Sequence, residues 1–405
     1  MSLPLEGVRI LDMSRILAGP SCTQLLGDLG ADVIKIERPG VGDDTRSWGP
    51  PFLEDAHGAP THESAYFLST NRNKRSVTID ITSPDGKAIL NDLIDRSDVL
   101  VENFKVGHLA RYGFSWEQVR ERKPSLIYCS ITGFGQTGPY ASRPGYDFII
   151  QGMGGLMSIT GEKEGPPMKV GVPIADIMAG MYACVAILTA LLDRKATGRG
   201  RHIDISLLDC QVAWLYNQAM NYLVSGEEPA RLGNAHPNIV PYETFSTSDG
   251  YINVGVGNDA QFFRFCTAIG RQDLRQDPRF ATNSLRLKHR EILIEELQKT
   301  LAQRTSAHWL EICHRASVPC GPINLMREVF SDPHIKARSL IEEVLHPAAA
   351  GRPVRLLRSP IRMTDAELGI RIPPPMLGQH TEEVLSKELG YHSAKIAALR
   401  DKGVI

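Results

Sequence analysis

The sequence predicts an α/β protein built around a parallel sheet. Within the first 133 residues, short runs rich in β-branched residues alternate with helix-like segments. The helix-like segments also carry start and stop signals, such as Pro20 and Gly30 at the two ends of the first one. Strands separated in this way by helices are typical of a parallel sheet that is covered on both faces.

The elements of this sheet can be assigned in order along the chain. Ser83 is the expected cap of the second helix, with Pro84 at its first position. Strands are predicted over 8–13, 31–37, 76–81, 98–103 and 125–133, and helices over 20–30, 83–97 and 116–122.

The second half of the chain predicts an inserted domain. The apolar run Ile177–Leu192 indicates a core helix, because 16 residues are too few to span a bilayer comfortably. A strand over 202–206, a second long apolar helix over 207–224 and, near the end, a helix capped by Thr381 are also expected. The predicted organisation is a large domain that begins with 1–200, a linker helix at 201–224, a small α/β domain at 225–320, and a linker and return to the large domain at 321–405.

Composition excludes several classes of protein. Charged residues make up 22% of the 405 and the formal net charge is −1, which indicates a soluble globular protein that binds neither nucleic acid nor a membrane. The seven cysteines are scattered without a C-x-x-C pair, and the histidines lack ligand spacing, so neither disulfides nor a metal site is indicated. The start MSLPLEGVRI lacks signal-peptide features, so we expect a cytoplasmic location, with a mature mitochondrial matrix form left open.

Polar and basic side chains collect where the predicted strands end, which is where parallel sheets bind ligands. Each could be a solvated surface group, but together they suit a phosphorylated cofactor or an acidic substrate. No G-x-G-x-x-G follows the first strand and no P-loop occurs, so a classical nucleotide site is not supported. The segment GFGQTGP (133–139) is either a close backbone approach or a simple turn. The residues concerned are Arg15, Arg38, Arg46, Lys74, Asn103 and Arg111.

Asp176 precedes the most apolar helix and has two interpretations. Aspartate is a preferred helix N-cap, which alone would explain it. Alternatively, a partly desolvated carboxylate beside helix amides can attack an activated acyl group. The small residues Gly171, Ala175 and Ala179 would leave room for a substrate.

The chain resembles the class III CoA-transferases, which include the formyl-CoA:oxalate and carnitine CoA-transferases. The matching segments span nearly the whole chain in the family's order. Within the family, the chain is most similar to the branch that moves CoA from succinyl-CoA to a dicarboxylate such as glutarate or itaconate. The segments are LEGVRILDMSRILAGPSCTQLLGDLGADVIKIERPGVGDDTR, NRNKRSVTIDI, DVLVENF, GFGQTGPYASRPGYD, PIADIMAGMYACVAILTAL with TGRG, VPCGPI, and PPPMLGQHTEEVL.

The resemblance implies a fold and a mechanism. A large Rossmann-like domain is formed by both chain ends, a small domain is inserted between them, and two ring-like subunits interlock as a homodimer. No cofactor is held permanently, and coenzyme A thioesters are the substrates. Asp176 matches the family's nucleophile, which forms an aspartyl–acyl anhydride and then an aspartyl-CoA thioester.

The resemblance also implies binding residues. Leu17 replaces a glutamine of the formyl-CoA enzyme, so a different acid is expected. Charge and position also suggest that three arginines bind the distal carboxylate of the acceptor acid. They are Arg15, Arg46 and Arg72. His236, in GNAHPNIVP, either covers the substrate or lies in a polar turn. The implied CoA contacts are Leu17, Ala18, Arg38, Asn71, Lys74, Asn103, Phe104, Arg111, Arg143 and Tyr146.

Two other functions share these features. An α-methylacyl-CoA racemase needs two acid/base groups beside the α-carbon, and the racemases carry a GHD triplet where this chain has GYD. Tyr146 is a poor base near neutral pH, which favours transfer. A non-catalytic CoA-binding protein would retain Arg38 and Asn103 but would not need Asp176.

Overall fold

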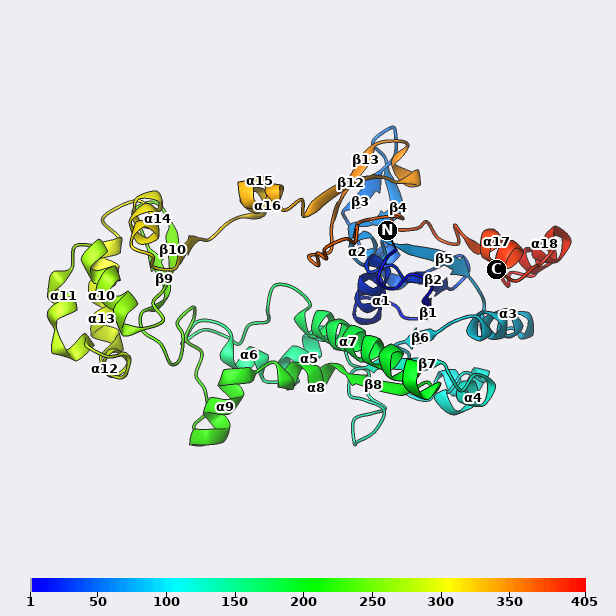
Figure 1. The fold of residues 1–405 in the computed structure, drawn as a ribbon, viewed down its shortest axis with the longest axis horizontal. Coiled ribbons are helices and arrows are strands. Elements are labelled where there is room, and N and C mark those ends of the chain that lie inside the picture. Colours follow the sequence, from blue (N-terminus) through cyan, green and yellow to red (C-terminus); the bar gives the residue numbers. More distant parts are fainter. Residues whose placement is uncertain (1) are drawn as a thin grey trace. The chain divides into compact units, whose positions relative to one another are not determined.

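The computed structural model describes residues 2–405, which form two compact units (Figure 1). Unit 1 contains the chain up to Leu156, together with Lys169–Leu223 and Ala337–Ile405. Unit 2 contains Met157–Met168 and Val224–Lys336, where the sequence suggested a small domain at 225–320. The chain therefore leaves unit 1, forms most of unit 2, and returns.

Unit 1 is built on a six-stranded sheet in which every neighbouring pair is parallel. Numbered by their order in the chain, the strands lie 3-2-1-4-5-6, the arrangement of doubly wound nucleotide-binding folds. The predicted α/β class with a Rossmann-like large domain is confirmed. The sheet order is β5 (Lys74–Thr78), β2 (Asp32–Glu37), β1 (Arg9–Asp12), β6 (Val99–Glu102), β7 (Ile127–Thr132) and β8 (His202–Ser206).

Helices cover both faces of this sheet because successive strand residues point to opposite sides. Ile10 and Val99 pack in one core with α1 (Ala18–Asp28) and α7 (Ile174–Thr197), whereas Leu11 and Leu100 pack in the other. The second face is covered by α3 (Pro84–Asp95), α4 (Trp116–Arg122), η5 (Val384–Glu388) and α18 (Ser393–Asp401). The C-terminal segment thus completes the core of unit 1.

Helices α1 and α7 approach closely at Gly180. A methyl group at this position would lie 2.7 Å from the carbonyl oxygen of Ala18 and closer still to the Ser21 hydroxyl. Asp176 is four residues before Gly180, and residues at that spacing share one face of a helix. The packing of α7 therefore turns Asp176 toward the start of α1.

The interpretation of residues 177–192 as part of a core helix is confirmed. The helix is longer than the 16-residue apolar run, however, so the argument that it is too short to span a bilayer was wrong. α7 has 24 residues and is the one helix within residues 2–405 that is long and apolar enough to cross a membrane. Of its most apolar 18-residue stretch, 56% is buried inside the protein, as in the core helix of a folded domain. All seven cysteines are free thiols, and six of them are buried.

Several boundaries differ from the sequence prediction. Strand β5 covers residues 74–78 instead of 76–81. The single helix expected over 207–224 is divided into α8 (Leu207–Ala213) and α9 (Tyr216–Ser225), because Tyr216 adopts a φ of 38° that interrupts a helix. The proposed linker at 201–224 also contains β8, an edge strand of the main sheet.

The predicted cap Ser83 is confirmed, since its hydroxyl accepts a hydrogen bond from the Gly86 amide at 3.0 Å. The predicted cap Thr381 is wrong. His380 precedes α17 (Thr381–Glu383), and the Thr381 hydroxyl instead accepts a hydrogen bond from the Thr78 amide at 2.9 Å. Thr381 therefore fastens the C-terminal segment to the edge strand β5.

Other elements carried no clear periodic signal because they are short. They are η1 (Asp44–Ser47), β3 (Phe52–Glu54), β4 (Pro60–Ser64), α2 (Ala65–Thr70), η2 (Leu109–Tyr112), α5 (Asp147–Met153), α6 (Leu156–Ile159), α16 (Pro333–Ala337), β12 (Ile341–Leu345), η4 (Pro347–Ala349) and β13 (Pro353–Leu357).

Asn73 joins the two chain ends of unit 1. Its backbone has a φ of 58°, which asparagine tolerates better than most residues. Its side-chain oxygen accepts hydrogen bonds from the amides of Arg371 at 2.7 Å and Ile372 at 3.0 Å. The Asn73 amide in turn donates to the Ile372 carbonyl at 2.8 Å.

Unit 2 has an antiparallel three-stranded sheet in the order β11 (Cys320–Pro322), β10 (Tyr251–Gly255) and β9 (Tyr242–Ser246). Phe245 and Ile252 from this sheet pack against helical residues such as Phe262 and Leu297. Its helices are α10 (Asp259–Ala268), α11 (Gln272–Gln276), η3 (Pro278–Phe280), α12 (Asn283–Lys288), α13 (Arg290–Leu301), α14 (Ser306–Arg315) and α15 (Met326–Ser331).

Candidate active site

The strand order reverses between β1 and β6, and open parallel sheets bind ligands at such a point. Asn103, directly after β6, bridges to the loop that follows β1. Its side-chain oxygen accepts from the Arg15 amide at 2.9 Å, and its side-chain nitrogen donates to the Arg15 carbonyl at 2.6 Å. The Arg15 guanidinium lies 5.6 Å from the centre of the Phe104 ring. Three predicted residues thus meet at this crevice.

Leu17 and Ala18 lie beside them, where the same loop enters α1. Both side chains are buried, so these residues can offer a ligand only their backbone groups. Amides at the start of a helix of this length attract anionic groups such as phosphates. Their role in contacting CoA stays a prediction.

Asp176 is the third residue of α7, and the interpretation as an N-cap is wrong. The helix begins at Ile174 after Pro173, which makes no side-chain cap. Asp147 satisfies this helix end instead, since its Oδ1 accepts a hydrogen bond from the Ala175 amide at 2.8 Å. The carboxylate of Asp176 is therefore not needed to start the helix.

The Asp176 side chain is buried without a partner. It is 8% exposed, and within residues 2–405 its carboxylate forms neither a hydrogen bond nor an ion pair. Burial, followed by the negative charge of Asp147, raises the pKa of Asp176 to about 7. An acid kept in this costly state is a candidate for chemistry.

Tyr66, on α2, lies within electrostatic range of Asp176. Burial, together with the charges of Asp176, Asp147 and Asp43, raises the pKa of its phenol. The ring of Trp48 packs edge-on against Tyr66, with 5.1 Å between the ring centres. A neutral phenol at this site can donate a hydrogen bond to a substrate oxygen.

Sequence reasoning missed Tyr66, Trp48 and Asp147. The first two lie among short elements without a periodic pattern. Asp147 belongs to the triplet GYD, where only the tyrosine was considered.

Two of the arginines predicted to bind substrate are engaged inside the protein. Arg46 is buried and donates to Glu37 at 2.8 Å and to Glu63 at 3.0 Å. Arg72 is also buried and donates from Nε to Asp28 at 3.0 Å. Because these cations already have carboxylate partners, the structure favours a role for them in the scaffold.

Lys74 and Asn71 are likewise buried. The Lys74 ammonium donates to Asp12 at 3.1 Å and to the side-chain oxygen of Asn71 at 3.0 Å. Burial lowers the pKa of Lys74 to about 8, despite the opposing effect of Asp12. These contacts hold both predicted side chains inside unit 1.

The other CoA candidates are exposed. Arg38 follows β2, and Arg111 lies on η2. Tyr146 is 61% exposed, and the Arg143 guanidinium lies 3.9 Å from the centre of the Tyr140 ring. These four side chains are accessible to a ligand in solution.

The glycines of GFGQTGP permit a close approach, as the sequence suggested, but within the protein itself. A methyl group on Gly133 would lie 2.6 Å from the Cα of Gly145. This crossing fixes the segment that carries Tyr146 and Asp147 beside the end of β7.

His236 belongs to unit 2, whereas the residues above belong to unit 1. Its Nδ1 accepts a hydrogen bond from the Asn238 amide at 3.0 Å, and its ring centre lies 5.2 Å from that of Tyr242. Tyr242 and Asn234 also line a hollow of about 420 Å³ on the small sheet. The segment 233–241 is therefore an ordered turn of unit 2.

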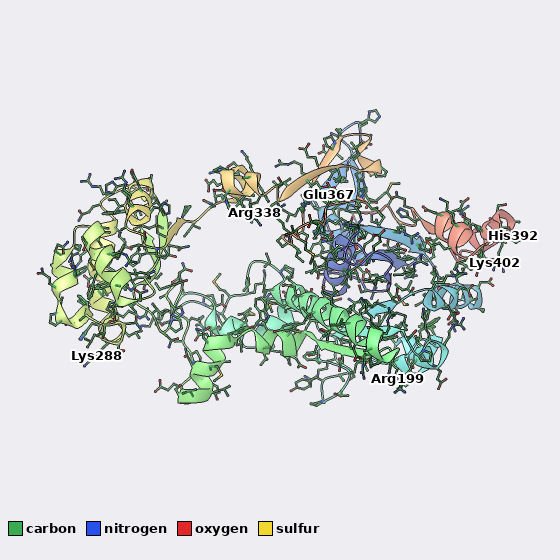
Figure 2. The ribbon with its side chains drawn as sticks, viewed as in Figure 1. Arg199, Lys288, Arg338, Glu367, His392 and Lys402 are labelled. Atoms are coloured by element: carbon green, nitrogen blue, oxygen red, sulfur yellow. The ribbon has the colours of Figure 1, made fainter. Side chains whose placement is uncertain are left out.

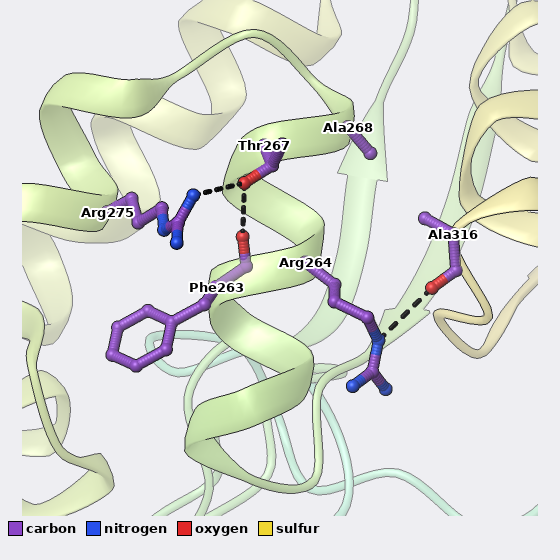
Figure 3. A pocket seen from close by; sticks show the side chains of 6 residues that line it. All are labelled: Phe263, Arg264, Thr267, Ala268, Arg275 and Ala316. Atoms are coloured by element: carbon purple, nitrogen blue, oxygen red, sulfur yellow. Dashed lines mark hydrogen bonds between the residues drawn. The ribbon is translucent and has the colours of Figure 1, made fainter.

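A second hollow of unit 2, of about 360 Å³, lies beside α10 (Figure 3). Its arginines are engaged, since Arg275 donates to Thr267 at 3.2 Å and Arg264 to the Ala316 carbonyl at 3.2 Å. This hollow contains none of the predicted residues. Within residues 2–405, no group of three or more His, Cys, Asp or Glu side chains is placed to hold a metal ion.

Comparisons with known proteins found a matching family, similar sequences and similar structures. The model of CoA-transferase family III matches residues 5–381. The chain is 48% identical to the succinate–glutarate CoA-transferase of Agrobacterium fabrum over 95% of each chain. It is 44% identical to the human succinyl-CoA:glutarate CoA-transferase, covering 99% of this chain and 90% of that one. The crystal structure of a CAIB/BAIF family protein from Brucella suis superposes with a TM-score of 0.84 at 47% identity, covering 96% and 100% of the two chains.

Proposed function

Because the chain belongs to CoA-transferase family III, we propose that it transfers CoA from succinyl-CoA to a small dicarboxylate, with glutarate as the acceptor. The observation that carries this proposal is the buried, unpartnered carboxylate of Asp176 at the edge of the sheet where ligands bind. The names of the relatives favour transfer over racemisation.

In the first step, a carboxylate oxygen of Asp176 attacks the thioester carbon of succinyl-CoA. The carbon–sulfur bond breaks, CoA leaves as a thiolate, and an aspartyl–succinyl anhydride forms. Because Asp176 is poorly hydrated and its pKa is about 7, its ionised form is more nucleophilic than an ordinary carboxylate and is still populated at neutral pH.

In the second step, the thiolate attacks the Asp176 carbonyl and releases succinate, which leaves an aspartyl-CoA thioester. A carboxylate of glutarate then attacks this thioester, giving an aspartyl–glutaryl anhydride and thiolate again. Attack of the thiolate on the glutaryl carbon yields glutaryl-CoA and restores the Asp176 carboxylate. Every covalent step retains the energy of the thioester, so no ATP is needed.

Arg15 is the predicted arginine that remains suited to the distal carboxylate of the acceptor. Its side chain is 47% exposed, and its ion pair with Asp44, at 3.0 Å, lies at the surface, where such pairs are weak. A guanidinium can bind a carboxylate through two hydrogen bonds. Arg15 therefore supports selection of a dicarboxylate.

The function is tested by incubating the purified protein with succinyl-CoA and a panel of acids, without ATP. The panel contains glutarate, itaconate, oxalate and the monocarboxylate butyrate, and new thioesters are identified by mass spectrometry. We expect glutaryl-CoA and free succinate in equal amounts. Absence of transfer to every acid would contradict the proposal, and transfer to butyrate alone would contradict the choice of a dicarboxylate.

Replacing Asp147 with asparagine should shift the pH dependence of transfer. Ionised Asp176 is the nucleophile, so wild-type kcat/KM should fall as the pH drops through about 7. Asparagine can still accept the Ala175 hydrogen bond but carries no charge, so the pKa of Asp176 should decrease. We expect the acidic limb to move down by about half to one pH unit.

The control is Asp95→Asn, which removes an exposed carboxylate that pairs with Arg122. It should leave the acidic limb in place. An unchanged limb in Asp147→Asn would show that Asp147 does not act on the nucleophile.

We also propose that the protein forms a homodimer through the outer face of α7. Met181, Val185 and Leu192 form an apolar stripe on that face and are 52%, 62% and 70% exposed. A helix that is apolar on both sides normally has both sides covered. A second copy of the chain, as the family resemblance implies, would provide that cover.

Val185→Glu should weaken the dimer because it places a charge in the middle of this stripe. We expect the mass measured by light scattering to shift toward one chain as the protein is diluted. Arg199→Glu is the control, since Arg199 lies beyond the end of α7 and is exposed (Figure 2). A dimer of unchanged stability in Val185→Glu would exclude this face as the interface.

A further inference from the structure

We propose that Asp43, together with Lys35, is a positioning residue that holds the loop Ser14–Leu17 in the shape that CoA binding requires. This inference rests on the proposed function, since that loop forms one wall of the crevice between β1 and β6. Asp43 acts through the loop and is not assigned a contact with the substrate.

The loop is strained at Ile16. Its φ is 71°, in the left-handed region that a β-branched residue rarely adopts. Such a conformation persists only where the surroundings enforce it, and it is concentrated at ligand sites.

Asp43 supplies the contact at the strained residue. Both of its carboxylate oxygens accept from the Ile16 amide, at 3.2 and 3.3 Å. The carboxylate is itself fixed by Thr45, whose amide and hydroxyl donate to it at 3.0 and 2.8 Å. The Asp43 amide donates to Glu37 at 2.9 Å, so the segment that carries Asp43 is anchored to the end of β2.

Lys35 connects Asp43 to the other end of the loop. Its fully buried ammonium donates to Asp43 at 2.9 Å and to the Ser14 carbonyl at 2.9 Å. Ser14 is held in turn by Asp12, which accepts from its amide at 3.0 Å. Charged groups therefore bind the loop at Ser14 and at Ile16. Asn103, at the end of β6, binds the backbone of Arg15.

Positioning of the loop explains this arrangement better than overall stability does. A buried ion pair contributes little net stability compared with apolar packing, but it fixes groups in one geometry. Here the groups it fixes lead directly into Leu17 and Ala18 at the start of α1, and α7 packs on Ala18 one turn from Asp176. Asp43 and Lys35, together called the clamp, thus fix the wall of the crevice that leads toward Asp176.

The first test is hydrogen exchange, which does not depend on catalysis. In Asp43→Asn the charge that holds Lys35 is lost, and the amide of Ile16 loses one of its two acceptor oxygens. We expect peptides covering residues 14–18 to exchange at least about tenfold faster while the sheet stays protected. Unchanged exchange at this loop would contradict the positioning role of Asp43, whether or not the protein is a transferase.

The second test separates positioning from general destabilisation. Asp43→Asn should raise the KM for succinyl-CoA about tenfold or more and change kcat about threefold or less, since the chemistry at Asp176 is retained. Asp32→Asn is the matched control, because it removes the ion pairs with Arg9 and Arg75 at the opposite end of β2. It should lower the melting temperature without raising KM.

A rescue variant tests the strain itself. Glycine adopts the left-handed region without penalty. Ile16→Gly combined with Asp43→Asn should therefore recover most of the affinity for succinyl-CoA that Asp43→Asn loses. If Asp43 instead contacted the substrate, this second change would recover nothing. If Asp43→Asn does not fold, Thr45→Val removes the 2.8 Å hydrogen bond to Asp43 and should produce a smaller rise in KM.

The outcomes distinguish this inference from the proposed function. If the wild-type protein binds CoA but transfers nothing, the function fails, and the affinity of each variant for CoA, measured by calorimetry, still tests the clamp. If transfer is intact and KM is unchanged in Asp43→Asn, the clamp fails and the function stands.

Discussion

Asp176→Asn should abolish CoA transfer and at the same time make the protein more stable at pH 8. Asparagine is close in shape to aspartate but cannot form the anhydride, so we expect kcat to fall by at least about three orders of magnitude. The gain in stability follows from burial, because the carboxylate is 8% exposed and has no partner within residues 2–405.

The sign of the stability change depends on pH. The pKa of Asp176 is about 7 in the folded protein and 3.8 in the reference state, so between these values the folded state binds more protons than the unfolded one. The carboxylate therefore destabilises the fold increasingly as the pH rises toward 7. Removing its charge should add about 2–4 kcal/mol to the free energy of unfolding at pH 8, and almost nothing below pH 4.

Asp209→Asn is the matched control for this experiment. Asp209 is also the third residue of a helix, α8, but it is exposed. Its replacement should cost a few tenths of a kcal/mol through the helix dipole, with no gain at pH 8. Retained transfer by Asp176→Asn would contradict the role of Asp176 as nucleophile. A loss of stability at every pH would contradict the destabilising effect of its buried charge.

Gly180→Ala should destabilise unit 1 and lower activity together. The added methyl group would lie 2.7 Å from the Ala18 carbonyl oxygen, which is backbone and cannot rotate away. Separating α1 from α7 should cost about 2–4 kcal/mol, more than the roughly 1 kcal/mol that alanine contributes to helix formation. Activity should fall as well, since Asp176 lies on the same face of α7.

Denaturant unfolding and transfer assays check this prediction. Gly171→Ala is the control for the unfolding measurement, because nothing lies within 4 Å of a methyl group there. Adding Ser21→Ala to Gly180→Ala should recover part of the loss by removing the Ser21 hydroxyl from the same contact. Wild-type stability of Gly180→Ala would show that the two helices can separate at little cost.

The sheet was predictable because its strands carry strong local signals. β1, β2, β6 and β7 are short apolar runs, and Ser83 with Pro84 marks the start of α3. The break between α8 and α9 was not predictable, since it depends on the backbone conformation of Tyr216 in an otherwise helical pattern. Local sequence does not encode such a break when the residues on both sides favour a helix.

The site was predictable only in part. Asn103, Phe104 and Arg15 were found because strand ends meet at one edge of a parallel sheet. Whether Asp176 caps its helix depended on Asp147, which reaches the helix start from 28 residues away. Charge alone could not show that Arg46 and Arg72 face buried carboxylates, because their partners come from other elements of the fold.

The connection between Asn73 and the Arg371–Ile372 amides has a consequence during synthesis. The amide groups that Asn73 binds emerge from the ribosome 298 and 299 residues after it. At a translation rate of about 5–20 residues per second, about 15–60 s pass between the synthesis of Asn73 and that of these amide groups. We therefore expect the early translation product to need chaperone protection, while most of unit 2, encoded in one stretch, can fold before release.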